Sequence, residues 1–308
     1  MITIYKGTGV GLETITQPTS GCWINVVDPS PEEVAQLAQT LGIPQDFFTY
    51  PLDMDERART EKENGATLIV LRVPRFEGEA SDVPYVTVPL GIVLSEWFVA
   101  TVCKVEASVV QALYQARELS TSKRNRFILR VLRITANLYL QDLRKIDATV
   151  DVLEDRLQHS LRNRELLELL KYQKSLVYFT TALKSDELIL RHLQKYQLFQ
   201  QYPEDLDLLE DVLTEVQQAI EMTNISGNIL SQMMDAFASI ISNNLNAVMK
   251  FLASVTIILS LPTMIASFYG MNVPVPMGQW AWAFPLILVA CVVVCAGAAV
   301  LFWRKDWL

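Results

Sequence analysis

The sequence predicts an α+β membrane protein, with an α/β domain first, long antiparallel helices next, and a long stalk helix that continues into the first of two membrane-spanning helices. Three observations predict this fold class. Short β-favouring runs alternate with helical stretches over residues 1–105, and an almost unbroken helical pattern follows over residues 106–202. Between Lys250 and Arg304 the chain has no Asp, Glu, Lys, Arg or His and holds two long apolar segments.

The overall composition argues against some classes of function and favours others. A net charge of −8 argues against nucleic-acid binding and favours the handling of cations. The four cysteines have no CxxC spacing and the chain has only His159 and His192, which argues against a His/Cys zinc site. Met1–Tyr5 lacks the basic and apolar regions of a signal peptide, so we expect the amino terminus to stay in the cytosol.

Residues 1–105 are predicted to form a cytoplasmic α/β domain. Strands are expected at Ile2–Tyr5, Cys22–Val27, Thr67–Val73, Tyr85–Val88, Gly91–Leu94 and Phe98–Cys103. Ser30-Pro31-Glu32-Glu33 has the form of a capping box and opens a helix that ends at Leu41, before Gly42, and Ile43–Tyr50 is expected to be a second short helix. No phosphate loop or nucleophile elbow is visible, so we do not expect an enzyme.

This domain has two acidic clusters. The first consists of Asp53, Asp55, Glu56, Glu61 and Glu63, which surround the basic residues Arg57, Arg59 and Lys62. That mixture favours a solvated surface whose charges pair with one another. The second consists of Glu77, Glu79 and Asp82, around a turn at Gly78.

Residues 106–202 are predicted to be helical. Val109, Leu113 and Ala116 mark a short helix, and apolar residues at helical spacing from Phe127 to Leu157 mark a long one. A turn is expected at Arg162–Glu165, followed by a helix from Leu166 to about Leu198. A basic face is formed by Lys123, Arg124, Arg126, Arg130 and Arg133. It is expected to be solvated or paired with acids of a neighbouring helix, and contact with anionic lipid is the alternative.

Residues 203–250 are predicted to form a stalk helix with an unusual charge pattern. No Lys or Arg lies between Lys195 and Lys250. The acids of this interval are Glu204, Asp205, Asp207, Glu210, Asp211, Glu215, Glu221 and Asp235. Like charges along a helix destabilise it, so these acids need cations or basic neighbours.

A stripe of small polar and flexible apolar side chains follows at steps of three and four residues: Asn246, Met249, Leu252, Thr256, Ser260 and Thr263. In an oligomer this stripe would line a pore. Asn246 would offer a ring of neutral oxygens, and Met249 and Leu252 a hydrophobic constriction that gates by dewetting. The alternative is helix–helix packing through small residues. Pro262 should bend the helix slightly.

The apolar segments predict a hairpin that crosses the membrane twice. The first span covers residues 251–269, an external loop covers 270–280, the second span covers 281–303, and a basic cytoplasmic tail covers 304–308. Lys250, Arg304 and Lys305 flank the spans and the loop has no charge, so both termini should be cytoplasmic in a multi-pass protein of the cell membrane. Trp280, Trp282, Trp303 and Trp307 lie where interfacial aromatics belong, and Cys291 and Cys295 are expected to be small packing residues.

The first span ends in Tyr269-Gly270-Met271-Asn272, and here the chain resembles the CorA family of divalent-cation channels, which have this signature in a carboxy-terminal hairpin. The resemblance extends to Asn246–Lys250 before the span, Pro262-Thr263 within it and Lys305–Leu308 after it. It also includes the early run from Trp23 to Pro29. The similarity therefore covers most of the chain.

The resemblance implies a homopentameric funnel in the lipid bilayer that conducts Mg²⁺ passively, with Gly270, Met271 and Asn272 as the selectivity filter. Mg²⁺ gives up its water reluctantly, so a ring of neutral Asn272 carbonyls would suit the hydrated ion. By position, Asp211 matches a regulatory metal ligand at the subunit interface and Asp235 an acid that gathers cations in the funnel. The alternative for Asp211 is a solvated face or a salt bridge with the middle helices. Mg²⁺ would then be both the transported and the regulatory ion.

The external loop departs from the family pattern. Many members have an acidic residue after the tripeptide, whereas Val273–Trp280 has none. The preference among Mg²⁺, Co²⁺, Ni²⁺ and Zn²⁺ therefore stays open, and a Zn²⁺ or Co²⁺ transporter of the same family is one alternative. No soft or imidazole ligand lies near the expected pore to favour it. The other alternative is a two-span receptor or scaffold without ion flux.

Overall fold

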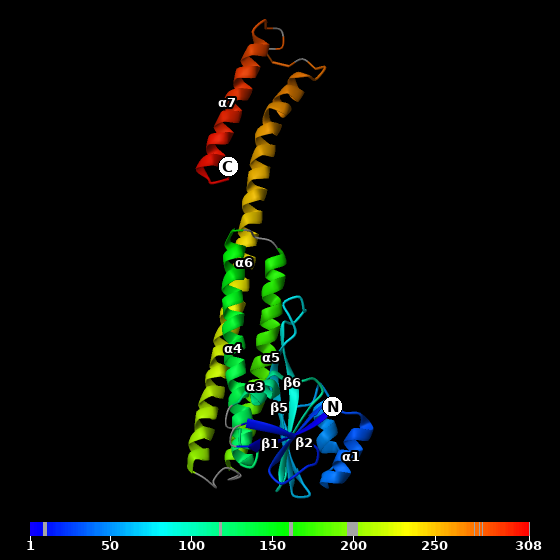
Figure 1. Ribbon diagram of the computed structural model, residues 1–308. Coiled ribbons are helices and arrows are strands. Elements are labelled where there is room, and N and C mark those ends of the chain that lie inside the picture. The colour runs from blue at the N-terminus through cyan, green and yellow to red at the C-terminus, as the bar shows by residue number, and fades with distance from the viewer. Residues whose placement is uncertain are drawn as a thin grey trace. The chain divides into compact units, whose positions relative to one another are not determined.

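The structure is a computed structural model that describes residues 1–8, 11–116, 119–159, 163–195, 203–273, 275–276, 278 and 280–307. It divides into two compact units, Met1–Met234 and Asp235–Leu308. One helix, α6 (Pro203–Tyr269), contributes residues to both units. Figure 1 shows the order of the elements along the chain.

A mixed seven-stranded sheet forms the centre of the first unit. Its strands are β1 (Ile2–Thr8), β2 (Gly11–Ile15), β3 (Cys22–Val27), β4 (Arg59–Glu63), β5 (Ala66–Phe76), β6 (Tyr85–Leu94) and β7 (Phe98–Cys103). They lie in the order β2-β1-β3-β7-β6-β5-β4. Neighbours are antiparallel except β3 and β7, which are parallel.

Helices cover both faces of the sheet, as the alternation of apolar side chains requires. On one face, Cys22, Ile24 and Val26 share a buried cluster with side chains of α1 (Pro31–Leu41) and α2 (Asp46–Thr49). On the other face, Trp23 contacts Tyr114 of α3 (Ser108–Gln115) and Phe127 of α4 (Arg124–His159). The helix α5 (Asn163–Lys195) packs on β5 and β6 (Figure 1).

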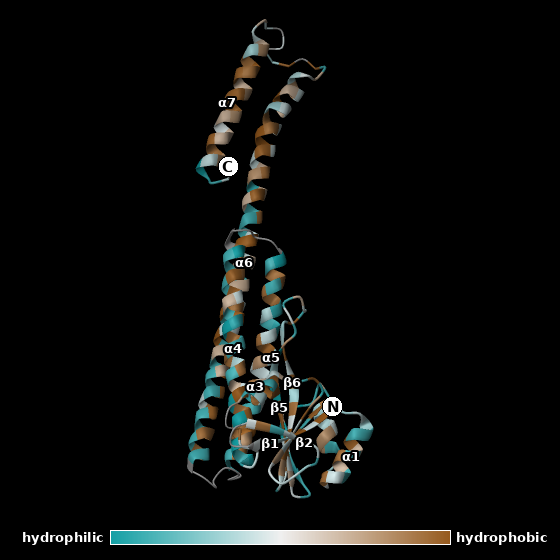
Figure 2. Ribbon diagram, in the orientation of Figure 1, coloured by the Kyte–Doolittle hydropathy of each residue, from teal (hydrophilic) through white to brown (hydrophobic). Residues whose placement is uncertain are grey.

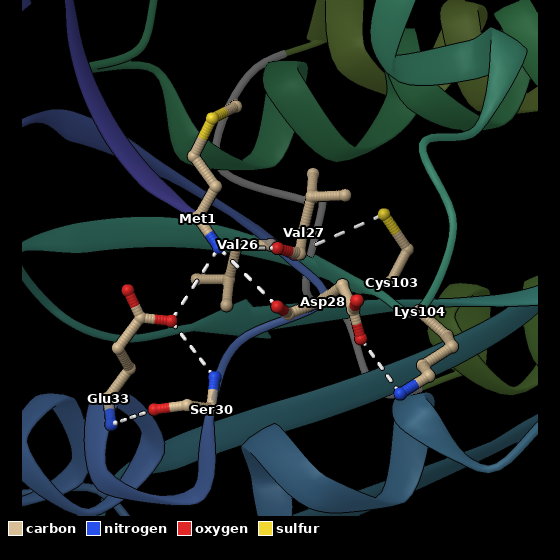
Figure 3. Close-up of polar contacts among 8 residues, drawn as sticks. All are labelled: Met1, Val26, Val27, Asp28, Ser30, Glu33, Cys103 and Lys104. Carbon is tan, nitrogen blue, oxygen red and sulfur yellow. Dashed lines mark hydrogen bonds and ion pairs between the residues drawn. The ribbon is translucent and has the colours of Figure 1, made fainter.

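The start of α1 has the predicted capping box. The Ser30 hydroxyl accepts a hydrogen bond from the Glu33 backbone N–H at 3.2 Å, and the Glu33 carboxylate accepts one from the Ser30 N–H at 2.9 Å. Figure 3 shows two ion pairs near these bonds. The Met1 ammonium, just before β1, lies 3.6 Å from the same Glu33 oxygen, and Lys104, just after β7, pairs with Asp28, just after β3, at 2.8 Å. The helix ends at Leu41, where Gly42 takes the left-handed conformation.

The predicted strands differ from the observed ones at the sheet edges and in β6. The edge strands β2 and β4 were not predicted, since an edge strand needs no apolar run and β4 has the sequence Arg-Thr-Glu-Lys-Glu. The separate strands predicted before and after Pro89 are wrong, because β6 is continuous. β7 pairs with β6 only from Gly91 onward, so Pro89 removes no hydrogen bond from that ladder.

The helices α3 to α5 agree with the predicted helical region apart from their ends. The helix α3 ends at Gln115, α4 runs from Arg124 to His159, and α5 begins at Asn163 rather than after a turn at residues 162–165. The predicted end of α5 near residue 198 lies outside the described residues. Residues 1–105, 106–202 and 203–250 all contribute to the first unit, so their division into separate domains stays a prediction.

The second unit consists of the carboxy-terminal part of α6 and the helix α7 (Ala283–Arg304). Both are long and apolar enough to cross a membrane, with mean hydropathies of 1.9 and 2.8 over their most apolar windows. Figure 2 shows the hydrophobic stretches of these two helices. The fold class, an α/β domain followed by long helices and two apolar helices, is as predicted.

Candidate ion pathway

The six side chains of the predicted pore stripe lie on one exposed face of α6. All six, which are Asn246, Met249, Leu252, Thr256, Ser260 and Thr263, are exposed in the single chain. The opposite face of the helix contains Ser254, Ile258 and Pro262, of which the last two line a groove together with Cys291 and Cys295 of α7. The helix α7 therefore packs on the side of α6 away from the stripe, and the stripe stays free for another surface.

The hydroxyls of this stripe are oriented by their own helix. Thr256, Ser260 and Thr263 donate to the carbonyls of Leu252, Ile257 and Leu259 at 2.8, 2.9 and 2.9 Å. A hydroxyl that has donated its hydrogen has only lone pairs left to offer. The same three side chains line one shallow groove with Leu259, Met264, Ser267 and Phe268. The exposed area of this groove is mostly apolar, and its four hydroxyl side chains provide oxygen acceptors that suit the water shell of a cation.

The tripeptide Gly270-Met271-Asn272 follows the last residue of α6. Gly270 closes the helix by donating its N–H to the Ala266 carbonyl at 2.9 Å. It does not take the left-handed conformation of a typical capping glycine, but a Cβ atom at this position would lie only 3.3 Å from the Ala266 oxygen. Asn272 is exposed immediately beyond the helix end.

At the other end of the stripe, Asn246 lies beside the carboxy-terminal tail of the chain. Asn246 lines a groove with Lys250, Asp306 and Trp307, among other residues. The tail turns back after α7, with the Trp307 ring stacked 5.6 Å from the Phe302 ring. The groove at Asn246 is therefore lined by one basic and one acidic side chain.

Three of the eight acids of α6 pair with the basic face of α4. Arg126 binds Glu204 at 2.7 Å and Asp205 at 2.9 Å, and Arg133 binds Glu215 at 3.5 Å. Hydrogen bonding to Arg126 lowers the pKa of Glu204, whereas burial raises the pKa of Glu215 against the opposing charge of Arg133. The basic face of the sequence therefore pairs in part with acids of a neighbouring helix, the first of the two expectations for it.

The remaining acids of α6 form an exposed acidic face: Asp207, Glu210, Asp211, Glu221 and Asp235. Within the described residues none of the five takes part in an ion pair. The two acidic side chains among the predicted metal ligands, Asp211 and Asp235, thus lie on a face of α6 without an ion pair among the described residues. The charge of Asp211 helps to raise the pKa of Glu215, one turn along α6. The described residues nevertheless contain no group of three or more His, Cys, Asp or Glu side chains that could hold a metal ion.

The acidic clusters near the sheet are paired in part with basic side chains of the same chain. Arg59 pairs with Glu56 at 3.2 Å and with Glu61 at 3.5 Å, and Arg75 pairs with Glu77 at 2.7 Å. Gly78 has a φ of 99°, as a turn residue should. The first cluster therefore agrees in part with the predicted self-paired surface.

One contact in the second unit was not predicted from the sequence. The Cys295 thiol donates to the backbone carbonyl of Ile258 at 3.5 Å. Cys295 was expected only to pack, and the signal that could have revealed its bond is Pro262, which removes the N–H that would ordinarily bind this carbonyl.

Two curated proteins resemble the chain over nearly its whole length. The cobalt/magnesium transport protein CorA of Methanocaldococcus jannaschii is 26% identical over 93% of this chain and 91% of that protein. The protein of the same name from Thermotoga maritima is 26% identical over 93% of this chain and 83% of that protein.

A solved structure has the same fold. The complete structure of the CorA magnesium transporter from M. jannaschii matches with a TM-score of 0.87 and 24% identity, and the match covers 100% of this chain and 99% of that chain. The sequence profile of the family described as CorA-like Mg²⁺ transporter proteins matches residues 19–305, which is most of the chain. This chain therefore belongs to the CorA family of membrane transporters.

Proposed function

We propose that the chain forms an ion channel that lets hydrated Mg²⁺ flow passively into the cell. The observation that carries this proposal is the exposed face of α6 that runs from Asn246 to Thr263 and leads to Asn272, turned away from α7. Two relatives are named cobalt/magnesium transport proteins, so Co²⁺ is proposed as a second transported ion. We place the protein in the cell membrane with both termini in the cytosol.

The pore requires several copies of the chain. A single hairpin cannot enclose an aqueous path, because one face of α6 lies against α7 and the other is exposed. We propose a homopentamer in the lipid bilayer in which the α6 stripes of the subunits face one another. The Asn272 amides would then form the neutral oxygen ring that selects the hydrated ion, and Met249 and Leu252 would form the hydrophobic constriction.

Regulation is proposed to act through the acidic face of α6. Asp211 is exposed and has no basic partner among the described side chains, so it can take a divalent cation jointly with an acid of a neighbouring subunit. Asp235 would gather cations in the funnel. A fall in cytosolic Mg²⁺ would empty the interface sites, leave like charges opposed and loosen the closed arrangement.

Mg²⁺ uptake into proteoliposomes tests the channel. The liposomes contain a Mg²⁺-sensitive dye, and wild type is compared with Asn272→Ala and with Val273→Ala, a matched control at the next exposed position. We expect uptake by wild type and the control and its loss in Asn272→Ala. Uptake of Zn²⁺ in place of Mg²⁺ would favour the zinc-transporting alternative. No uptake of Mg²⁺, Co²⁺ or Zn²⁺ by correctly assembled protein would favour a receptor or scaffold.

A second arm tests the regulatory site. Liposomes with increasing internal Mg²⁺ report the concentration that stops uptake. We expect Asp211→Asn to raise that concentration, because the interface site binds Mg²⁺ less tightly, while Glu210→Gln, at the neighbouring exposed acid, leaves it near the wild-type value. Equal effects of the two substitutions would point to general electrostatics instead of a site at Asp211.

A further inference from the structure

The backbone carbonyl of Ile258 lies at a break in the hydrogen-bond ladder of α6. In an α-helix each carbonyl accepts from the N–H four residues later, and for Ile258 that residue is Pro262. Proline has no N–H, and its ring also pushes against the carbonyl four residues before it. The Ile258 oxygen therefore lacks its ordinary helical donor within the apolar part of the helix.

A donor from the other span reaches this oxygen. The Cys295 Sγ of α7 lies 3.5 Å from the Ile258 oxygen. Cys295 and Pro262 line the same groove between the two helices, together with Cys291 and Ala299. These three α7 residues follow one another at intervals of four, so they form a stripe of small side chains that lets α7 approach the helix backbone.

Neighbouring side-chain donors on α6 are committed elsewhere. The Ser260 hydroxyl donates to the Ile257 carbonyl at 2.9 Å, and the Thr263 hydroxyl donates to the Leu259 carbonyl at 2.9 Å. Among the side-chain hydrogen bonds of the described residues, the one that the Ile258 oxygen accepts is donated by the Cys295 thiol. In a bilayer core no water can take its place, so a freed carbonyl must find its donor within the protein.

From this geometry we infer that Cys295 is a positioning residue for transport. Its thiol supplies the hydrogen bond that Pro262 removes, and so the second span fixes the shape of the pore-lining helix at Pro262. Pro262 lies between Ser260 and Thr263, whose hydroxyls belong to the exposed stripe. The direction of α6 on either side of Pro262 sets how these two hydroxyls are presented. The effect on transport rests on the proposed channel function, whereas the hydrogen bond itself does not.

Infrared spectroscopy of the full-length protein in liposomes tests the bond directly. The S–H stretch of a thiol falls in frequency when the thiol donates a hydrogen bond. The difference between wild type and Cys295→Ala isolates the band of Cys295, and the difference between wild type and Cys291→Ala isolates that of Cys291. Cys291 is the matched control, since it lines the same groove but has no hydrogen bond to α6 among those of the described residues. We expect the Cys295 band at the lower frequency.

Pro262→Ala provides the second measurement and leaves both cysteines in place. The substitution restores the N–H at position 262, which competes for the Ile258 oxygen. We therefore expect the low-frequency S–H band to move up toward the frequency of Cys291. A Cys295 band that already coincides with that of Cys291, or one that does not move in Pro262→Ala, would overturn the inference whether or not the protein transports ions.

Uptake measurements then test the positioning role. An interhelical hydrogen bond in a membrane typically changes an equilibrium about threefold. We expect Cys295→Val to slow Mg²⁺ uptake by about that factor at unchanged apparent Mg²⁺ affinity, Cys295→Ser to retain the rate because it keeps a donor, and Cys291→Val to behave as wild type. In the Pro262→Ala background, Cys295→Val should have no further effect. Equal slowing by Cys295→Val in both backgrounds would contradict coupling through Pro262.

Discussion

The Asp186 carboxylate of α5 accepts a hydrogen bond of 3.0 Å from the backbone N–H of Arg72 in β5. The Arg72 carbonyl on the same strand accepts one of 2.8 Å from the Tyr139 hydroxyl of α4. β4 pairs with β5 only as far as Val70, so these backbone groups lie beyond the end of that ladder. Two helices thus complete the hydrogen bonding of a strand and attach the helical region to the sheet.

Asp186 should make the stability of the protein depend on pH. Burial raises its pKa well above the ordinary value, and one of its carboxylate oxygens is buried without a partner among the described residues. Arg72, whose positive charge opposes this shift, and Tyr139, whose own pKa burial raises, are the charged and titratable groups around it. Between the unfolded and folded pKa values the native state holds one proton more, so stability falls as pH rises through that window.

We therefore expect Asp186→Asn to unfold at a higher temperature than wild type at neutral pH and to lose this advantage as the pH falls toward the unfolded pKa. The Asn side chain keeps the acceptor for the Arg72 N–H and has no charge to bury. Thermal unfolding of the full-length protein in detergent over a pH series measures the difference. Glu221→Gln, at an exposed acid of α6, serves as control. A constant offset between Asp186→Asn and wild type over the whole series would contradict the raised pKa.

Arg126 should stabilise the junction of α4 and α6. Its guanidinium binds the carboxylates of Glu204 and Asp205, of which Asp205 is only 2% exposed. Arg126→Ala leaves the buried Asp205 carboxylate without its partner, which typically costs about 1–3 kcal/mol. Arg130→Ala, one turn along at an exposed position, is the control with little expected effect. Denaturant unfolding of full-length protein compares them, and equal stability of the two variants would mean that Asp205 finds water or another donor.

Two glycines should respond to alanine in opposite directions. A Cβ atom at Gly91 of β6 would overlap the ring of Pro51, so Gly91→Ala overpacks the region and should destabilise the protein by about 1–3 kcal/mol. Gly227 lies within α6 and a Cβ there meets nothing within 4 Å. Gly227→Ala should therefore raise stability by up to about 1 kcal/mol through helix propensity. Unfolding temperatures of both variants check the two signs.

Local sequence patterns predicted those strands and helices whose bounds depend on interactions between neighbouring residues. The strand Cys22–Val27 and the helix after Ser30 have the predicted bounds, because the β-favouring run and the capping box are properties of consecutive residues. The edge strand β4 was missed, since its charged side chains serve to protect an edge that only the tertiary fold creates.

Local patterns could not predict contacts between residues that lie far apart in the sequence. Arg72 and Asp186 are 114 positions apart, and nothing near either residue indicates the other. Cys295 and Ile258 are 37 positions apart, although Pro262 marks the carbonyl that needs a donor. For the candidate ion pathway, residue spacing alone placed the stripe from Asn246 to Thr263 on one face of the helix. The structure shows in addition that α7 packs on the other face and leaves the stripe exposed.

The exposed stripe of α6 leads to a final prediction, which rests on the proposed channel. In an assembled pore, Ser260 should face water while Val293 of α7, which is exposed in the single chain, should face lipid. Ser260→Cys should therefore react with a charged, membrane-impermeant thiol reagent and lose Mg²⁺ uptake, because the bulky group occupies the path. Val293→Cys should react slowly and keep its uptake, like wild type with its native Cys291 and Cys295. If instead Val293→Cys were blocked and Ser260→Cys spared, α7 and not α6 would line the path, and the proposed role of the hydroxyl stripe would fail.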